Sequence, residues 1–201
     1  MTQPFGVILA GGQATRMGGC DKGLLSLGNA TILSHVIDRL EPQVAAMALN
    51  ANGDPARFQE FKLPVIPDSI EGSAGPLAGV LAGLDWAARE GAEHIVTAAA
   101  DTPFFPADLV PRLIFAAEEY KVPIALARTE AGRHPTFGLW PVDLRDHLRS
   151  ALKDGMRKVV AWSDVHGTAY ADFPSVGLDP FFNVNTPKDL AEAEALLEAA
   201  E

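Results

Sequence analysis

Cysteine is nearly absent from this chain, which has one, Cys20, among its 201 residues. A single cysteine excludes a disulfide within the chain and every metal site that needs several thiolates. It also favours a reducing compartment, where free thiols persist. Cys20 lies in a glycine-rich loop, and we interpret it as a bystander thiol rather than a nucleophile.

Long apolar runs are also missing. No stretch approaches the ~20 residues that a membrane-spanning helix requires. The residues before Phe5 contain neither the basic region nor the apolar core of a signal peptide. We therefore expect a cytoplasmic protein.

Positive charge is scarce, with 16 Lys and Arg residues against 26 Asp and Glu and a formal net charge of −10. An acidic chain is repelled by nucleic acids and anionic membranes, so the charge balance disfavours both as partners. A local basic pocket for a small anion stays compatible with this balance.

What is present is the composition of a globular domain, with 48% hydrophobic and 21% charged residues. Short apolar runs predict strands at residues 5–9, 44–49, 64–66, 94–100, 123–127, 137–140 and 168–171. Helical patterns cover residues 32–40, 55–61, 76–90, 106–120, 144–152 and the end of the chain from 187. We expect residues 132–136 to form a turn. The alternation of strand, polar turn and helix predicts a single α/β domain over residues 1–201. Its expected architecture is a three-layer α/β/α sandwich, Rossmann-like, with a mostly parallel sheet.

The densest pattern is the stretch from residue 9 to residue 23, which follows the first predicted strand and holds five glycines together with Arg16 and Lys22. Glycines allow backbone N–H groups to approach an anion, and the two cations can neutralise phosphoryl oxygens. The spacing fits neither a Walker A loop nor a dinucleotide fingerprint. We interpret the stretch as the seat of a nucleoside triphosphate.

Asp101 is the candidate metal ligand. It follows a strand of small apolar residues, so its carboxylate is expected at the carboxyl edge of the sheet, facing the glycine-rich loop. Mg²⁺ needs few protein carboxylates, because water and substrate phosphates complete its coordination. A helix N-cap is the alternative role for Asp101, and the two roles are compatible.

The glycine-rich stretch resembles the signature L-A-G-G-x-x-x-R-M-G-x-x-K of nucleotidyltransferases of the nucleotide-sugar pyrophosphorylase type. Further segments recur in the same order in the molybdenum cofactor guanylyltransferases: Asp68-Ser69, Gly75-Pro76-Leu77-Ala78-Gly79, Asp101-Thr102-Pro103, Arg133-His134-Pro135-Thr136 and Asn183-Val184-Asn185-Thr186-Pro187. This resemblance spans essentially the whole chain. It implies a Mg²⁺-dependent transfer of GMP from GTP to the phosphate of molybdenum–molybdopterin, with release of pyrophosphate.

The resemblance also implies the residues of the donor site. The backbone of Leu9, Ala10, Gly11 and Gly12 would hold the base and phosphates of GTP, and Arg16, Lys22 and Asp101 would be the catalytic residues. Asn50 and Asp68 would contact GTP, and an amide with a carboxylate can complement guanine. A pair of Asx turns is the alternative for these two residues, and Asn52 replaces Asn50 if the strand ends later.

The acceptor would bind to the second half of the chain. Residues 1–105 form the GTP and Mg²⁺ half, and residues 106–201 form the molybdopterin half. Arg133, His134 and Thr136 would hold the acceptor phosphate, and Asn183 and Asn185 would lie near the pterin. A structural histidine and a plain turn with a helix cap are the alternatives.

Other functions stay open. Transient contacts with molybdenum insertion proteins and with apo-molybdoenzymes or their chaperones are compatible with the resemblance. A sister transferase that uses CTP, a non-catalytic cofactor carrier and an NAD-dependent oxidoreductase are the rivals. The glycine spacing disfavours the oxidoreductase, whereas physical reasoning on the residues does not choose between GTP and CTP.

Overall fold

The structure is a computed structural model that describes residues 2–11, 21–70, 72, 75–175 and 179–199. The predicted Arg16 and Gly12 lie outside the described residues, as does Cys20. No helix in the described part of the chain is long and apolar enough to cross a membrane.

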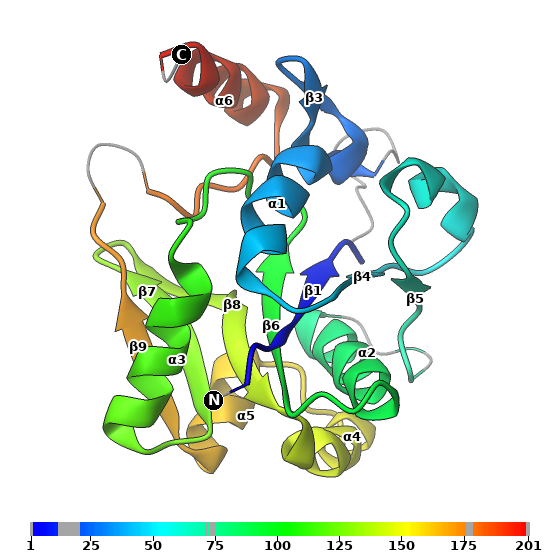
Figure 1. The fold of residues 1–201 in the computed structure, drawn as a ribbon, viewed down its shortest axis with the longest axis vertical. Helices are drawn as coiled ribbons and strands as arrows, with labels where there is room; N and C mark the ends of the chain where they lie inside the picture. Colours follow the sequence, from blue (N-terminus) through cyan, green and yellow to red (C-terminus); the bar gives the residue numbers. More distant parts are fainter. Residues whose placement is uncertain (1, 12–20, 71, 73–74, 176–178, 200–201) are drawn as a thin grey trace.

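The architecture is an α/β sandwich around a seven-stranded sheet with the strand order β5-β4-β1-β6-β8-β7-β9 (Figure 1). The sheet strands are β1 (Phe5–Leu9), β4 (Met47–Asn50), β5 (Val65–Ile66), β6 (His94–Ala99), β7 (Ile124–Thr129), β8 (Gly132–Pro141) and β9 (Thr168–Asp172). The α-helices are α1 (Ile32–Leu40), α2 (Pro76–Arg89), α3 (Leu109–Tyr120), α4 (Arg145–Lys153), α5 (Val159–His166) and α6 (Pro187–Ala199). The prediction of a three-layer fold with a mostly parallel sheet is confirmed. The exception is β8, which pairs antiparallel with both β6 and β7.

Short elements complete the fold. They are the hairpin of β2 (Ser26–Leu27) and β3 (Ala30–Thr31) and the 3-10 helices η2 (Lys22–Leu24), η3 (Glu41–Gln43), η4 (Pro55–Phe61) and η5 (Val142–Leu144). The expected helix over residues 55–61 is thus a 3-10 helix. The expected strand over residues 44–49 starts later, at Met47, because η3 occupies the residues just before Val44.

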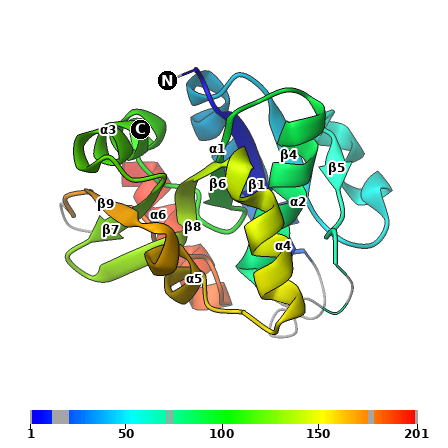
Figure 2. The same cartoon turned by 90° about the horizontal axis from the view of Figure 1, so that it is seen from below.

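The core lies on both faces of the sheet. In β1, Ile8 packs in the cluster that contains α1 and α3, whereas Val7 packs in the cluster that contains α2, α4 and α5. Successive side chains of a strand point to opposite faces, so a strand covered on both sides is a continuous apolar run. Figure 2 shows α3 on one side of the sheet and α4 and α5 on the other.

The helix starts follow local sequence rules. Thr31 caps α1, because its hydroxyl accepts a hydrogen bond from the Ser34 N–H at 3.1 Å. At α6 the Asp189 carboxylate accepts from the Thr186 N–H at 2.8 Å, and the Thr186 hydroxyl accepts from the Asp189 N–H at 3.2 Å. The predicted start of the last helix is therefore confirmed.

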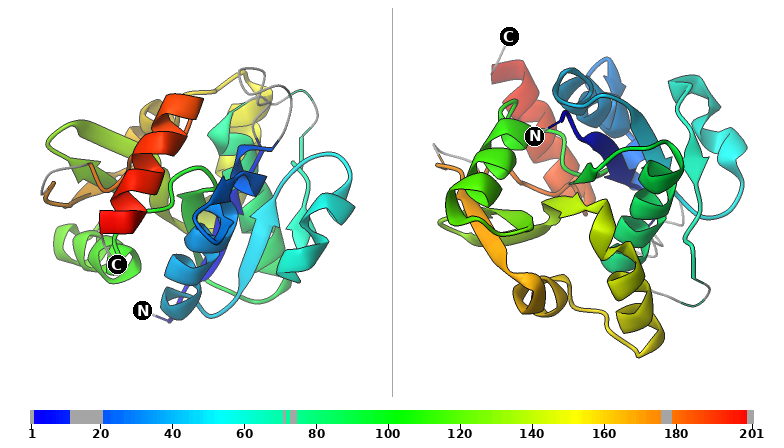
Figure 3. Two further views of the ribbon diagram at one scale, coloured as in Figure 1. Left: turned by 90° about the horizontal axis from the view of Figure 1, so that it is seen from above. Right: turned by 60° about the horizontal axis from the view of Figure 1, so that its bottom comes forward.

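The last helix lies against the hairpin. Val184 and Ala193 pack with Leu27 and Ile32 in a small separate cluster. Figure 3 shows α6 beside the hairpin and α1. The chain end is thus brought next to the segment that contains Lys22.

Residues 132–136 form the beginning of β8 rather than the turn that we expected. Gly132, Arg133 and His134 pair with Thr129, Arg128 and Ala127 of β7, so the hairpin closes at residues 130–131. A register shift between Leu126 and Ala127 then separates this part of β8 from the part that begins at Gly138.

Candidate active site

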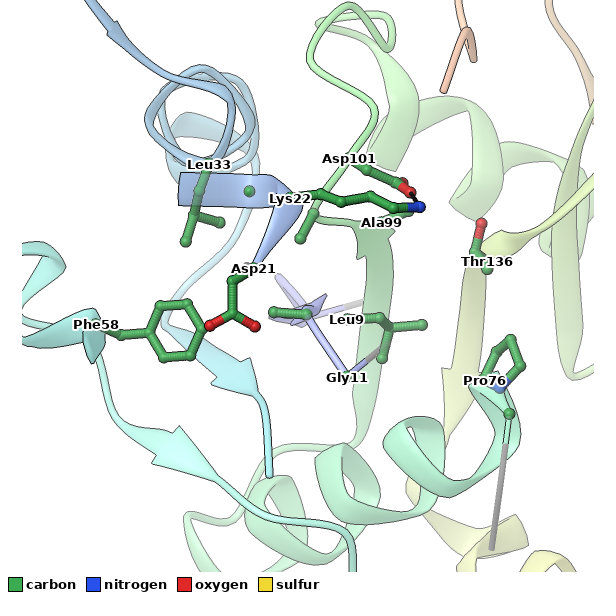
Figure 4. A pocket seen from close by; sticks show the side chains of 14 residues that line it. Leu9, Gly11, Asp21, Lys22, Leu33, Phe58, Pro76, Ala99, Asp101 and Thr136 are labelled. Carbon is green, nitrogen blue, oxygen red and sulfur yellow. Dashed lines mark ion pairs between the residues drawn. The ribbon is translucent and has the colours of Figure 1, made fainter. Parts of the chain in front are cut away.

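A cavity of about 230 Å³ opens where β1 and β6 end, at the carboxyl edge of the parallel strands. Its lining includes six of the predicted site residues: Leu9, Ala10, Gly11, Lys22, Asp101 and Thr136. Figure 4 labels all of them except Ala10 and shows them converging from the ends of β1 and β6, from η2 and from β8. The position is the one that open α/β sheets use for ligands, because the loops that follow neighbouring parallel strands meet there.

Lys22 and Asp101 form a charged pair in the cavity, which Asp21 also lines. The Lys22 Nζ atom lies 3.9 Å from Asp101 Oδ2 and donates a hydrogen bond of 2.6 Å to the Asn185 Oδ1 atom. The two charged side chains are 23% and 28% exposed, so water screens them only in part. Burial raises the pKa of the Asp101 carboxyl above its ordinary value, and the nearby Lys22 ammonium opposes this shift incompletely.

The position of Asp101 fits a single-carboxylate Mg²⁺ ligand. Asp101 lines the cavity directly after β6, and α3 has Asp108 at its N-cap position, so Asp101 is not the cap of that helix. Among the described residues there is no group of three or more His, Cys, Asp or Glu side chains arranged to hold a metal. Mg²⁺ accepts such a site, since water and substrate phosphates supply its other ligands.

Asn50 and Asp68 contact each other beside the cavity. Asn50 is 3% exposed, and its Nδ2 atom donates to Asp68 Oδ1 at 3.0 Å and to the Ile66 carbonyl at 3.2 Å. Asn52 shares the same carboxylate, because its Nδ2 atom donates to Asp68 Oδ2 at 2.8 Å. The strand β4 ends at Asn50 itself, and the three residues form one network of amides around one carboxylate.

Gly11 and Gly79 make room for this network. A Cβ atom on Gly79 would overlap the Asn50 Oδ1 atom and would approach Leu9 Cδ2 to 2.8 Å. A Cβ atom on Gly11 would lie 3.4 Å from the same Asn50 oxygen. Gly11, after β1, and Gly79, in the first turn of α2, therefore allow these two segments to close around Asn50.

Arg133 and His134 diverge, although they are neighbours in the chain. The Arg133 guanidinium lies 4.8 Å from the centre of the Tyr170 ring and 3.9 Å from Asp164 Oδ2, on the side of α5. The His134 ring stacks on Phe181 with a centroid distance of 4.5 Å, within the core on the side of α3. Of the three predicted acceptor residues in β8, Thr136 alone lines the cavity.

Asn183 and Asn185 lie beside the segments that we predicted to bind GTP and Mg²⁺. The Thr102 hydroxyl donates to Asn183 Oδ1, and Lys22 donates to Asn185 Oδ1. We expected both amides near the pterin, and the structure brings them to the segments that contain Asp101 and Lys22.

Asp21 and Phe58 also line the cavity and were not among the predicted site residues. Asp21 Oδ2 lies 2.6 Å from Arg57 Nε, and Figure 4 shows the Asp21 carboxylate pointing toward Phe58. Asp21 stands next to Lys22 in the chain, a signal that reasoning from the sequence can use. Arg57 and Phe58 carry no such signal, since tertiary packing alone brings η4 to the cavity.

Comparisons with known proteins agree with this geometry. A family model described as MobA-like NTP transferase domain matches residues 6–168. The molybdenum cofactor guanylyltransferase of Mesorhizobium japonicum is 51% identical over 199 residues, which cover 96% of each chain. That of Rhodopseudomonas palustris strain HaA2 is 52% identical over 196 residues, covering 96% of this chain and 92% of its own.

Solved structures show the same fold. The molybdopterin-guanine dinucleotide biosynthesis protein A from Archaeoglobus fulgidus superposes with a TM-score of 0.76 at 22% identity, covering 97% of this chain and 99% of its own. A CMP:2-keto-3-deoxy-manno-octonic acid synthetase complexed with CTP superposes with a TM-score of 0.74 at 15% identity, over the whole of both chains. From the family model and the close relatives together, the chain belongs to the molybdenum cofactor guanylyltransferases, within the MobA-like NTP transferases.

Proposed function

We propose that this chain transfers GMP from GTP to the phosphate of molybdenum–molybdopterin, which yields the guanine dinucleotide form of the cofactor and pyrophosphate. The observation that carries the proposal is the cavity at the end of β1, where Lys22 and Asp101 lie 3.9 Å apart. Close relatives named molybdenum cofactor guanylyltransferase support the choice of substrates.

In this reaction an oxygen of the acceptor phosphate forms a bond to the α-phosphorus of GTP, and the bond from that phosphorus to pyrophosphate breaks. The acceptor oxygen is already ionised at neutral pH, so the site needs no strong general base. Catalysis then depends on positioning and charge neutralisation. Lys22 is suited to the second task, because its ammonium faces the cavity.

For the donor, we assign the backbone of Leu9, Ala10, Gly11 and Gly12 to the base and phosphates, and Arg16 and Lys22 to the triphosphate charge. Asn50 is suited to orient Asp68, since hydrogen bonds within the protein hold both side chains in place. A pre-organised pair loses little conformational freedom when it binds a nucleotide.

Asp101 would hold Mg²⁺, which when bound would neutralise charge on the triphosphate. Within the described part of the chain, Lys22 pairs with this carboxylate at 3.9 Å, and the Thr102 hydroxyl oxygen lies 3.4 Å from Asp101 Oδ1 while its proton is donated to Asn183. This arrangement keeps Asp101 at the cavity wall while leaving it capacity to accept further contacts.

For the acceptor, we assign residues 106–201, and within them Arg133, Thr136, Asn183 and Asn185 as contacts, with His134 supporting this region through its stacking on Phe181. Arg133 is half-exposed, its ion pair with Asp164 is long at 3.9 Å, and its guanidinium lies over the Tyr170 ring, so its outer N–H groups can reach a phosphate. We further propose that the reaction takes place in the cytoplasm, and that the product passes to apo-molybdoenzymes, their chaperones or insertion proteins through transient contacts.

The experiment that tests this function is a triphosphate-selectivity assay. The protein is incubated with GTP, CTP, ATP or UTP, each with Mg²⁺ and molybdenum–molybdopterin, and released pyrophosphate and the dinucleotide product are measured. We expect turnover with GTP. Faster turnover with CTP would make the protein a cytidylyltransferase, and binding of GTP without turnover would make it a carrier.

The Lys22→Met variant locates the activity in this cavity. It keeps the length of the side chain and removes its charge, so turnover should fall on the order of 10²-fold. Lys153→Met, at an exposed position of α4, is the matched control and should retain wild-type turnover. Full activity in Lys22→Met would contradict the assignment.

A further inference from the structure

Residues Asp179–Asn185, here called the strap, run across the edge of the sheet to the start of α6 (Figure 1). The strap contacts Lys22 and Asp101, the charged pair of the cavity. The Val184 N–H donates to the Asp101 carbonyl at 2.8 Å, and Asn185 accepts from Lys22 at 2.6 Å. The position of the strap therefore decides where the Lys22 ammonium is held.

His134 anchors the beginning of the strap. Its ring stacks on Phe181 at 4.5 Å with an interplanar angle of 22°, and Phe181 is itself buried against Phe137 and Phe173. The His134 Nε2 atom lies 2.9 Å from the Thr129 hydroxyl and 3.6 Å from Asp179 Oδ2. Aromatic stacking of this kind contributes beyond the area that it buries.

Asp179 links the His134 ring to the rest of the strap by accepting two backbone hydrogen bonds. Its Oδ1 atom accepts from the Phe181 N–H at 2.8 Å, and its carbonyl accepts from the Phe182 N–H at 3.0 Å. The turn that leads from Asp179 to Asn183 is thus fixed at the His134 ring. At its other end the strap is held by Val184, which is fully buried.

His134 is poorly suited to contact the acceptor phosphate itself. Its side chain is 17% exposed, Phe181 covers one face of the ring, and Nε2 is engaged by Thr129. Burial lowers its pKa, with Asp179 opposing the shift, so the ring is neutral at pH 7. A neutral, enclosed imidazole offers little to a phosphate dianion.

We propose that His134 is a positioning residue, which acts through Phe181 and the strap to keep Asn185 in contact with the Lys22 ammonium. This inference rests on the proposed GMP transfer and assigns to the donor half a residue that lies in the acceptor half. Without the ring, the strap is held less firmly and Asn185 no longer fixes the Lys22 ammonium. The ammonium must then be ordered when GTP binds, which weakens the affinity for GTP.

The test is a double-mutant cycle on GTP affinity, measured by calorimetry on the full-length protein with Mg²⁺ present. His134→Ala removes the ring beside Phe181, and Asn185→Ala removes the acceptor of the Lys22 hydrogen bond. Each single variant should weaken GTP binding by about ten-fold. The double variant should be no weaker than Asn185→Ala alone, because the two residues act in series. Additive losses would overturn the proposal.

Steady-state kinetics separate positioning from direct contact with the acceptor. His134→Ala should leave the KM for molybdenum–molybdopterin close to the wild-type value, while the KM for GTP rises. A raised KM for the acceptor with unchanged GTP affinity would make His134 an acceptor contact instead. If wild-type protein binds GTP and forms no dinucleotide product, the proposed function fails, whereas the binding cycle still decides the role of His134.

Two further variants test whether a loss of GTP affinity in His134→Ala comes from general unfolding. His134→Phe keeps an aromatic ring on Phe181 and should restore most of the GTP affinity. The same ten-fold loss in His134→Phe would overturn the role of stacking. His166→Ala is the matched control, since His166 also packs on an aromatic ring, Trp162 at 4.7 Å, away from the strap. It should bind GTP as the wild type does.

Discussion

The two halves of the sheet present their polar residues in different ways. In the first half the parallel strands β1, β4 and β6 all end at one edge, so Leu9, Asn50 and Asp101 arrive there together. In the second half the antiparallel β8 begins at that edge, and its alternating side chains send Arg133 and His134 to different faces. The residues at the ends of neighbouring parallel strands thus lie close together, whereas consecutive residues within β8 point to opposite faces of the sheet.

The halves also differ in how their cations are neutralised. Arg128 forms a two-point pair with Asp172 at 2.7 and 2.8 Å, which occupies its guanidinium. Lys22 has an amide partner at 2.6 Å and a carboxylate only at 3.9 Å. Lys22 therefore stays available to a ligand, whereas the Arg128 guanidinium is used to join β7 to β9.

Asp101→Asn should produce the largest effect, because it removes the one carboxylate assigned to Mg²⁺. Turnover should fall by on the order of 10²-fold or more. Burial raises the pKa of Asp101, so the folded state favours the neutral carboxyl, and ionisation at neutral pH costs stability. The variant should therefore melt at a slightly higher temperature than the wild type at pH 7 and at the same temperature well below pH 4.

The control for this variant is Asp108→Asn, which loses one exposed pair with Arg112. It should leave turnover unchanged and stability nearly so. Equal losses of turnover in Asp101→Asn and Asp108→Asn would show that the cavity carboxylate matters no more for turnover than a surface carboxylate.

Gly79→Ala should give the next largest effect, on GTP affinity. The new methyl group would collide with the Asn50 amide oxygen, which must shift and loosen its bond to Asp68. Overpacking of this kind costs about 2 kcal/mol. GTP binding restores the Asn50–Asp68 contact and so must supply this free energy, which weakens binding roughly thirty-fold. Calorimetric titration with GTP measures the change.

Gly83→Ala is a closely matched control, one turn further along α2. The three atoms nearest to its methyl group belong to Val7 and Ile95, at distances from 2.7 Å, and neither residue is assigned to the site. Both variants should melt earlier than the wild type, and Gly79→Ala alone should lose GTP affinity. A loss of affinity in both would mean that helix packing in general, rather than Asn50, controls the donor site.

Arg133→Gln should have the smallest effect, confined to the acceptor. An exposed cation contributes up to about 1 kcal/mol, so the KM for molybdenum–molybdopterin should rise about five-fold while GTP affinity stays unchanged. Arg128→Gln, at the paired position of β7, removes a guanidinium that Asp172 already occupies and should leave the KM unaltered. An unchanged KM in Arg133→Gln would remove that residue from the acceptor site.

Much of the fold followed from local patterns. The N-caps at Thr31 and near Thr186, the proline at the start of α2 and the apolar run of β1 are signals that neighbouring residues carry on their own. The start of β8 was predicted wrongly, because glycine and proline in residues 132–136 are typical of turns. Pairing with β7 and the register shift override that preference.

The sequence by itself predicted the donor side of the site, since a glycine-rich stretch and an aspartate that follows a buried strand are patterns of neighbouring residues. Only the tertiary structure decided that Asn185 meets Lys22, 163 residues away, and that His134 faces Phe181 rather than the cavity. The physical reason is that such contacts depend on which elements pack together, and packing is set by the whole chain rather than by any one segment.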